Sequence, residues 1–414
     1  MPSALVRAIT IGLVLSAASC GPQAVLLRDD TPIVVHASPR APEPTAPPET
    51  PRLAPLHRAP AFLFHPAAAP LSARAVTKAV RVAAVRADGL RIEGDCRGAS
   101  QVTAADGTRH RLPTRADASA IAIAPDGAHA AISTDAKVSL VALDPVRTLG
   151  TWEGRDAVWL DGDTLLLRQG CRLETLHGLR GTPTLSVLGE SCGRPLRVEP
   201  ARGRVWLAEF DDATPAEGSP RLQALVGMQR GAAPQRVELS PEDDALHDPR
   251  LAHDASILCG TARREDRSVL FCRPRDAGRL EPVAQDIVGA PVFARDAPRL
   301  LVTVGPRAQG PRDLHVVDFE LATVRRIARV PHRRVEFLPG ATQVFAFDGA
   351  RGVVYDLDTG VESRVGGEQD DWVGVLPNTP DAGSFLALRL RGGCNELLRV
   401  ELPSASAADA PSAP

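Results

Sequence analysis

The chain has 414 residues, of which 44% are hydrophobic and 24% are charged, so it is long enough and apolar enough to bury a large core. Its formal net charge of -2 excludes a general electrostatic attraction to nucleic acid or to an anionic membrane surface. Lysine occurs only at Lys78 and Lys137, and the arginines are scattered through the expected strands and turns instead of forming the basic patch of a nucleic-acid-binding protein.

Residues 1–19 have the pattern of a secretory signal peptide. Arg7 provides a short positive region, and the apolar run Ala8–Leu15 follows it. This run is too short to cross a bilayer as a helix, and no later segment is long and apolar enough to do so. The sequence therefore predicts an exported protein that is not an integral membrane protein.

The segment that ends at Cys20 bears on whether the exported protein is lipid-anchored or secreted. The run Leu15–Cys20 resembles a bacterial lipobox, which implies a lipoprotein acylated on Cys20 and anchored to the outer membrane of the cell envelope, on its periplasmic or surface side. Ala17 stands where the commonest lipobox has leucine, and Ser16–Ala18 also suits ordinary signal peptidase cleavage, which would give a secreted protein. The cysteine count favours the anchor, because removing Cys20 from the seven leaves an even set of six for an oxidising compartment.

Residues 20–75 are expected to form a lipid-anchored linker rich in proline and alanine. Proline cannot donate a regular ladder of hydrogen bonds and favours extended geometry, so this stretch predicts a semi-rigid stalk. Its apolar patch Ala61–Phe64 is expected to dock on the folded domain. The tail 404–414 has the composition of a disordered segment.

Residues 76–403 contain short apolar runs separated by Gly, Pro and Asp turns, with no sustained helical period. The clearest unit has four expected strands, which we label a to d, with the turn Pro125–Gly127 between the first two. These strands are Ala120–Ile123, Ala130–Ser133, Val138–Leu143 and Thr148–Trp152. Units of about 35–45 residues recur along the chain. They begin near Val80, Ala120, Ala157, Leu196, Leu251, Val292, Val335 and Trp372. The count is eight units, with seven blades as the alternative.

Two of these units carry recognisable turns. Ala124–Gly127 looks like the turn of the TolB-like and WD40-like bacterial propellers, and Tyr355–Gly360 resembles the end of the third strand in such blades. The resemblance extends over most of residues 76–402. It implies an all-β fold, a single β-propeller of four-stranded blades around a central channel. A single blade cannot bury both of its faces, whereas a closed ring of blades can.

Blade topology also suggests how the six remaining cysteines pair. Cys96, Cys171 and Cys394 fall in expected b–c turns and Cys192 in a connection between units, and these loops share one face of a propeller. Cys259 and Cys272 lie opposite each other across one hairpin. Six cysteines allow about fifteen connectivities. The pairs we favour are Cys96–Cys394, which would latch the ring, Cys171–Cys192 and Cys259–Cys272.

Three motifs were tested for chemistry. Gly189–Gly193 matches the nucleophile pattern G-x-S-x-G around Ser191, but that motif needs a following helix and here lies between two β-units. His247-Asp248 and His253-Asp254 match no zinc spacing, and Asp161–Asp163 is better explained as an a–b turn than as a calcium loop. We therefore expect no catalytic residue, no metal site and no cofactor.

The leading functional hypothesis is a non-catalytic cell-envelope lipoprotein whose propeller binds or scaffolds a partner protein through one face. The alternative is a propeller-type hydrolase or lyase with a metal-dependent site at the central channel. A structural envelope protein without a dedicated ligand is the third possibility. A channel lined by arginine or apolar side chains would favour the partner, and converging His, Asp and Glu side chains would favour the enzyme.

Overall fold

A computed structural model describes most of the chain between residues 53 and 402. The described residues are 53–86, 88–96, 99–112, 120–134, 136–199, 202–210, 222–239, 246–265, 267–276, 279–305, 312–330, 334–347, 351–366, 371–376 and 383–402. The expected signal peptide, Cys20, the linker before residue 53 and the tail 404–414 lie outside them. The described elements are all β-strands, and no helix in this part of the chain is long and apolar enough to cross a membrane.

Four consecutive sheets have the same four-stranded antiparallel architecture, and we name them blades 2 to 5. Blade 2 contains β7 (Ala120–Ile123), β8 (His129–Ser133), β9 (Lys137–Leu143) and β10 (Val146–Glu153). Blade 3 contains β11 (Arg155–Trp159), β12 (Thr164–Gln169), β13 (Arg172–His177) and β14 (Thr184–Glu190). Blade 4 contains β15 (Arg194–Glu199), β16 (Arg204–Phe210), β17 (Leu222–Gln229) and β18 (Gln235–Glu238). Blade 5 contains β19 (His247–Leu251), β20 (Ile257–Arg264), β21 (Arg267–Pro274) and β22 (Glu281–Gln285).

The next two sheets have the same plan with one additional strand each. Blade 6 contains β23 (Val292–Phe293), β24 (Arg299–Val304), β25 (Arg312–Asp318) and β26 (Thr323–Val330). Blade 7 contains β27 (Arg334–Phe337), β28 (Gln343–Phe347), β29 (Gly352–Asp356) and β30 (Val361–Val365). The additional strands come from the N-terminal part of the chain: β1 (His57–Arg58) pairs in parallel with β26, and β2 (His65–Pro66) pairs in parallel with β30.

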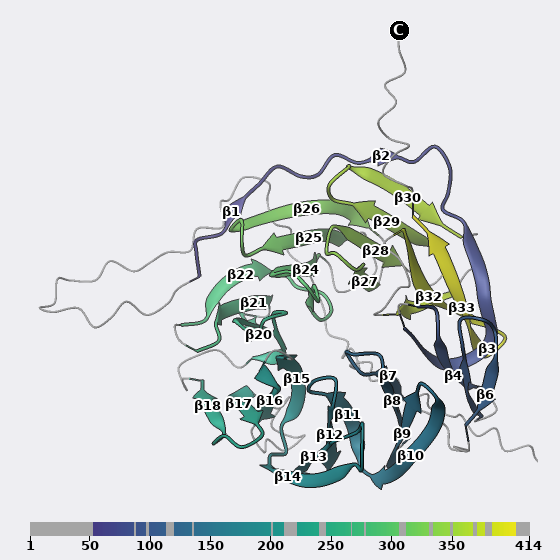
Figure 1. Ribbon diagram of the computed structural model, residues 1–414. Helices are drawn as coiled ribbons and strands as arrows, with labels where there is room; N and C mark the ends of the chain where they lie inside the picture. Colours follow the sequence, from purple (N-terminus) through teal and green to yellow (C-terminus); the bar gives the residue numbers. More distant parts are fainter. Residues whose placement is uncertain are drawn as a thin grey trace, which may run out of the picture.

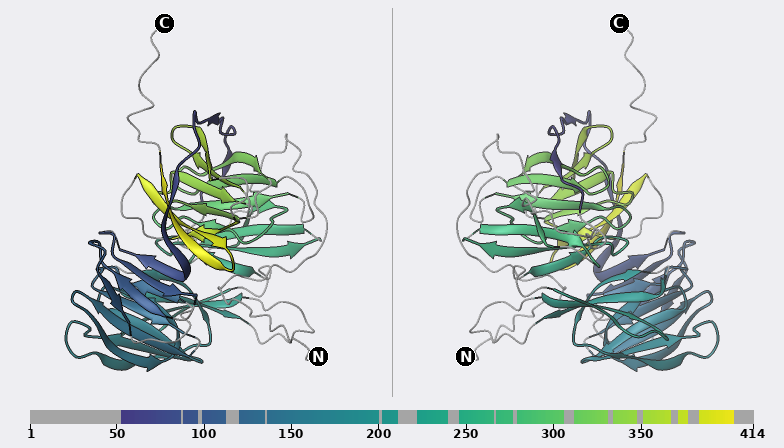
Figure 2. Two further views of the ribbon diagram at one scale, coloured as in Figure 1. Left: turned by 90° about the vertical axis from the view of Figure 1, so that its right-hand side faces the viewer. Right: turned by 90° about the vertical axis from the view of Figure 1, so that its left-hand side faces the viewer.

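Blades 8 and 1 share one long strand. Blade 8 contains β31 (Asp371–Val375), β32 (Ser384–Arg391) and β33 (Cys394–Glu401), and blade 1 contains β4 (Arg91–Asp95), β5 (Ser100–Thr103) and β6 (Arg109–Arg111). Strand β3 (Ala73–Val85) pairs with β33 through its first half and with β4 through its second half, so one strand completes both blades. The eight blades form a ring around a common axis (Figure 1), and a side view shows the sheets of the two halves of the chain inclined to each other (Figure 2).

Buried aliphatic and aromatic side chains fill the space between neighbouring blades all the way around the ring. Eight clusters are present, and each joins two consecutive blades. Val102 and Ile132 belong to the cluster between blades 1 and 2, and Val85 and Leu397 belong to the cluster that closes the ring between blades 1 and 8. The prediction of a single all-β propeller is confirmed, and the eight units begin where the sequence indicated.

Local chemistry explains the turns that separate the strands. In the turn between β7 and β8, the Gly127 N–H donates to the Ala124 carbonyl at 2.9 Å, and an Asp126 carboxylate oxygen accepts the Ala128 N–H at 2.9 Å. Gly127 has φ = 72°, a left-handed conformation that glycine adopts without steric cost. The Pro-Asp-Gly sequence is therefore a turn with a specific backbone requirement.

Residues 53–72 form a strap along the outer rim of blades 5 to 8 (Figure 1). Leu56 is buried in the cluster between blades 5 and 6, and Phe62 and Phe64 pack on the cluster between blades 6 and 7. The strap then enters β3, which runs through the expected boundary between residues 75 and 76. The apolar patch Ala61–Phe64 thus lies against the propeller, and residues 53–75 of the expected linker are part of its rim.

Three disulfides connect the pairs that the sequence favoured. Cys96 in the b–c turn of blade 1 is bonded to Cys394 at the start of β33, with Cα atoms 6.2 Å apart. A second bond joins Cys171, in the b–c turn of blade 3, to Cys192 in the connection to blade 4. The third joins Cys259 to Cys272, which face each other across β20 and β21. The first bond covalently links the first and last blades.

Candidate functional site

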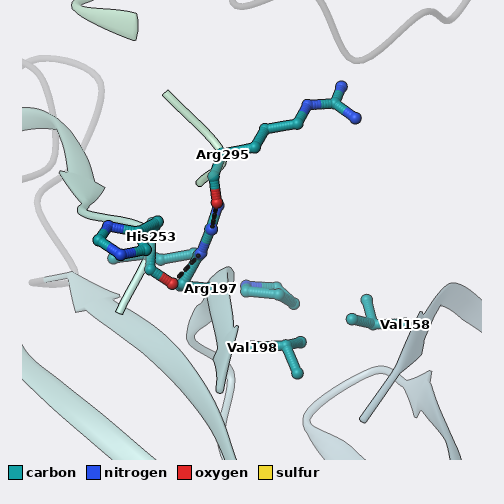
Figure 3. A pocket seen from close by; sticks show the side chains of 7 residues that line it. Val158, Arg197, Val198, His253 and Arg295 are labelled. Carbon is teal, nitrogen blue, oxygen red and sulfur yellow. Dashed lines mark hydrogen bonds between the residues drawn. The ribbon is translucent and has the colours of Figure 1, made fainter. Parts of the chain in front are cut away.

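A hollow of about 510 Å³ lies where the inner strands of blades 3 and 4 approach the a–b turns of blades 5 and 6 (Figure 3). We call it the axial hollow. Its lining combines basic and apolar side chains, and blade 4 supplies four consecutive residues of it. The lining residues are Val158, Pro195, Leu196, Arg197, Val198, His253 and Arg295.

Strand β15 contributes four residues to the hollow, and its pairing with β16 is interrupted among them. The register shifts between Pro195 and Arg197, so the strand contains an irregularity of the kind that re-aims side chains. As the inner strand of its blade, β15 has one unpaired edge, where a proline without an N–H group is tolerated. The sequence Pro-Leu-Arg-Val thus supplies apolar and basic residues to the hollow, and its Leu196 and Val198 also pack on the clusters between neighbouring blades.

Arg197 connects blade 4 to the two blades that follow. Its Nε donates to the His253 carbonyl oxygen at 3.1 Å, and its Nη2 donates to the Arg295 carbonyl oxygen at 2.8 Å. Figure 3 shows this side chain reaching toward both main-chain groups. Burial lowers the pKa of Arg197, and the positive charge of Arg295 lowers it further, whereas Asp254 and Asp296 raise it.

Arg295 has a different role in the hollow. Its guanidinium points away from the Arg197 contacts (Figure 3), and within the described residues it forms no hydrogen bond and no salt bridge. The side chain is accessible to water yet has protein around it, so desolvation lowers its pKa, while Glu336 and Asp296 raise it. Arg295 therefore carries a charge that no direct partner in the described chain neutralises.

The carboxylates of Asp254 and Asp296, which raise the pKa of Arg197, are engaged elsewhere. Asp254 accepts hydrogen bonds from the N–H and the hydroxyl of Ser256, at 2.9 and 2.6 Å. Asp296 accepts the Gly340 N–H at 2.8 Å, which ties the a–b turn of blade 6 to that of blade 7. Both carboxylates therefore stabilise turns, and neither forms a salt bridge with Arg197 or Arg295 in the described structure.

Further basic side chains lie on neighbouring inner strands. Burial lowers the pKa of Arg250 in β19, and the charge of Arg194 in β15 also lowers it, although Asp248 raises it. Arg334 in β27 donates to the Val373 carbonyl at 2.8 Å. Glu336 in the same strand is enclosed by protein, which raises its pKa, and it accepts the Val375 N–H at 3.2 Å. The inner strands thus hold several positive charges together with the carboxyl group of Glu336.

The residues that the sequence singled out for chemistry occupy separate places. His253 lines the axial hollow, whereas His247 begins β19. Among the described residues, no three His, Cys, Asp or Glu side chains gather as a metal site would require. Asp161–Asp163 forms the a–b turn of blade 3, where an Asp163 oxygen accepts the Leu179 N–H at 2.9 Å.

Ser191 lies between β14 and β15 with no helix after it. Its hydroxyl donates to Glu209 at 2.9 Å and accepts the Gly193 N–H at 3.1 Å. These bonds are those of a buried structural serine in a connection that a disulfide also fixes through Cys192. The geometry required of a nucleophile elbow, with a strand, a sharp turn and a helix, is not met here.

Sequence reasoning missed Arg197 and Arg295. They are 98 residues apart, and each belongs to a different blade. The available signal was an arginine within or just after the first strand of successive units: Arg155, Arg197, Arg250, Arg295 and Arg334. These arginines are scattered in the sequence. They can be recognised as neighbours only when it is known that the first strand of each unit faces the axis of the ring.

Comparisons with known proteins bear on the fold. No family model and no curated protein sequence matches the chain. Among solved structures, the Dos1 propeller has a TM-score of 0.54 with 10% identity and covers 80% of this chain and 94% of its own. The C-terminal WD40 domain of Sif2 has a TM-score of 0.51 with 9% identity, covering 81% of this chain and 99% of its own. The dihydro-heme d1 dehydrogenase NirN has a TM-score of 0.50 with 16% identity, covering 87% of this chain and 82% of its own. These neighbours include a dehydrogenase, a WD40 domain and a further propeller, and at such identities they share the β-propeller fold with this chain.

Proposed function

We propose that this protein is a non-catalytic binding module of the bacterial cell envelope, whose propeller docks a partner protein over the axial hollow. The observation that carries the proposal is the lining of that hollow, to which two arginines, Arg197 and Arg295, and several aliphatic residues contribute. Guanidinium groups attract anions and stay protonated in proteins, so they bind a ligand without exchanging protons with it. Aliphatic walls bury apolar atoms of the ligand. Such a lining is suited to binding.

The cellular location follows from the cysteines and the N-terminus. Three disulfides in the fold indicate an oxidising, extracytoplasmic compartment. We add the signal peptide 1–19 and lipidation of Cys20, which would anchor the chain to the outer membrane. The linker before residue 53 would then tether the propeller through the strap, which packs on the outer rim of the ring.

Crosslinking in intact cells, followed by purification of the protein from membranes, tests the proposal. The wild-type chain should recover a partner protein in stoichiometric amount. Cys20→Ser should move the propeller from the membrane to the soluble fraction, because a protein that lacks its acyl chains has no membrane anchor. Recovery of no stoichiometric partner, together with calcium or zinc binding by the purified protein, would favour the enzyme hypothesis instead.

A further inference from the structure

Neither arginine of the axial hollow has a carboxylate in direct contact among the described residues, in contrast to several other arginines of the chain. Arg86, Arg172, Arg236, Arg299 and Arg389 each form a salt bridge, with Asp88, Glu174, Glu209, Asp318 and Glu396 respectively. Among the described residues, neither Arg197 nor Arg295 forms one. The charge of Arg295 lowers the pKa of Arg197, so a ligand anion that binds at the hollow would offset this repulsion.

The hollow also retains unused hydrogen-bond donors. A guanidinium carries about five N–H donors in a planar fork that matches a carboxylate. Arg197 directs two of its donors to main-chain carbonyls, which fix its position, and Arg295 directs none to a partner in the described structure. An acidic group of a ligand can therefore bond to Arg295, and a second acceptor of the ligand to Arg197, without displacing an existing contact.

The aliphatic residues of the hollow indicate that the ligand has an apolar part beside its anionic group. Val158, Leu196 and Val198 contribute aliphatic surface, and Pro195 extends it. A volume of about 510 Å³ accommodates several side chains. Burial of an apolar side chain contributes roughly 1.5–3 kcal/mol, so a ligand with an apolar part beside its anionic group gains from both walls.

Arg295 is exposed and the other residues that line the hollow are half-buried, so the hollow is open to solvent. A segment that remains attached to a larger protein can enter an open hollow, whereas small-molecule sites enclose most of the ligand surface. The occupant that fits best is therefore a polypeptide segment in which an acidic side chain is flanked by apolar ones.

Building on the proposed partner-binding function, we infer that the axial hollow is the recognition site for an acidic and apolar segment of the partner protein. A carboxylate of that segment bonds to the Arg295 guanidinium, and a second acceptor of the segment bonds to the remaining donors of Arg197. The neighbouring apolar side chains lie against Val158, Leu196 and Val198.

Fluorescence anisotropy with defined peptides tests the inference on the purified propeller with its strap and disulfides intact. The probe is a fluorescein-labelled peptide of sequence Leu-Asp-Leu-Glu-Leu, and its amide counterpart, Leu-Asn-Leu-Gln-Leu, is the uncharged control. The acidic peptide should bind in a salt-sensitive manner, and the amide peptide should bind roughly 10- to 100-fold more weakly, since the charge-assisted hydrogen bonds are lost.

Arg295→Gln is the variant of choice, because Arg295 makes no hydrogen bond whose loss would disturb the described fold. It should weaken binding of the acidic peptide roughly 10- to 100-fold and leave the Tm unchanged. Arg180→Gln is the matched control: Arg180 is exposed over 76% of its side chain and lies outside the axial hollow, so its replacement should leave binding unchanged.

Absence of binding to the acidic peptide, or equal affinity of the wild-type protein and Arg295→Gln, would overturn the inference. Crosslinking with the Arg295→Gln protein then separates the two proposals. If the partner is still recovered in wild-type amount, the partner-binding function stands and the hollow is not its recognition site. If the wild-type protein recovers no partner, the proposed function itself fails.

Discussion

Phe64 in the strap packs edge-on against Tyr355 in β29, with ring centroids 5.1 Å apart. On the same segment, Arg325 of β26 lies over the Phe62 ring at 3.7 Å and donates from Nε to the Pro60 carbonyl at 2.7 Å. Side chains and main chain of the strap are thus both fixed to blades 6 and 7. The strap is a structural part of the propeller as well as a connection to the N-terminus.

Replacing Phe64 should therefore destabilise the whole ring. Phe64→Ala removes a half-buried ring and its edge-on contact with the buried Tyr355, which should lower the free energy of unfolding by about 1–3 kcal/mol. Leu63→Ala is the matched control, since Leu63 is 83% exposed, and its effect should stay within about 0.5 kcal/mol. Urea unfolding measures both. Equal effects of the two variants would show that the strap contributes nothing to the stability of the ring.

The sequence did not predict that the strap forms strands on the rim of the propeller. Its prolines indicated a linker, but they do not interrupt the hydrogen bonds that hold it. The N–H groups of His57, Ala59, His65 and Ala67 donate to β26, to β30 or to the turns before them, and Pro60, Pro66 and Pro70 occupy positions between such donors. An edge strand needs only alternate N–H groups, so proline at the other positions costs no bond.

A second prediction concerns the disulfide between the first and last blades. Cys96–Cys394 spans 298 residues and Cys171–Cys192 spans 21. In the chain-entropy description, the long loop contributes roughly 5 kcal/mol and the short one roughly 3 kcal/mol. Cys96→Ala/Cys394→Ala should therefore destabilise the protein more than Cys171→Ala/Cys192→Ala in urea unfolding under oxidising conditions. The reverse order would contradict the role of Cys96–Cys394 as the latch of the ring.

The blades and the cysteine pairs could be inferred from sequence because each depends on local patterns. Pro125–Gly127 determines a turn, alternating residues determine a strand, and turn positions bring Cys96 and Cys394 to one face. The axial hollow depends on long-range packing. Arg197 and Arg295 meet only because the ring brings blade 4 next to blades 5 and 6, and no local spacing encodes that approach.

A third prediction concerns the buried ion pair between blades 4 and 5. Arg275 Nη1 donates to Glu199 Oε1 at 2.6 Å, the same oxygen accepts the Trp206 Nε1–H at 2.7 Å, and the guanidinium lies 4.2 Å from the Trp206 ring centroid. Each member of the ion pair is 7% exposed. Arg275→Met leaves a buried carboxylate without its main partner and should cost about 3–5 kcal/mol.

The double variant Glu199→Gln/Arg275→Met removes both charges and keeps an oxygen acceptor for Trp206. It should recover a large part of the stability that Arg275→Met loses, because the cost arises from the unpaired charge and not from lost packing. Thermal unfolding of the single and double variants measures this recovery. A double variant as unstable as Arg275→Met would mean that the arginine acts through its contact with the Trp206 ring.

His315 in β25 gives the fold a dependence on acid. Burial lowers the pKa of this imidazole to about 4, and the charges of Arg58 and Arg326 lower it as well, whereas Asp313 raises it. In the unfolded chain a histidine has a pKa of about 6.5. As the pH falls below that value the unfolded state takes up a proton that the folded state does not, so stability present above pH 6.5 is lost toward pH 4, by up to about 3 kcal/mol.

His315→Gln removes the titrating group, so the stability of this variant should fall less than that of the wild-type protein between pH 7 and pH 4.5. Carboxylates titrate in both proteins and cancel in the difference. Parallel loss of stability in urea titrations at the two pH values would show that other groups cause the acid sensitivity.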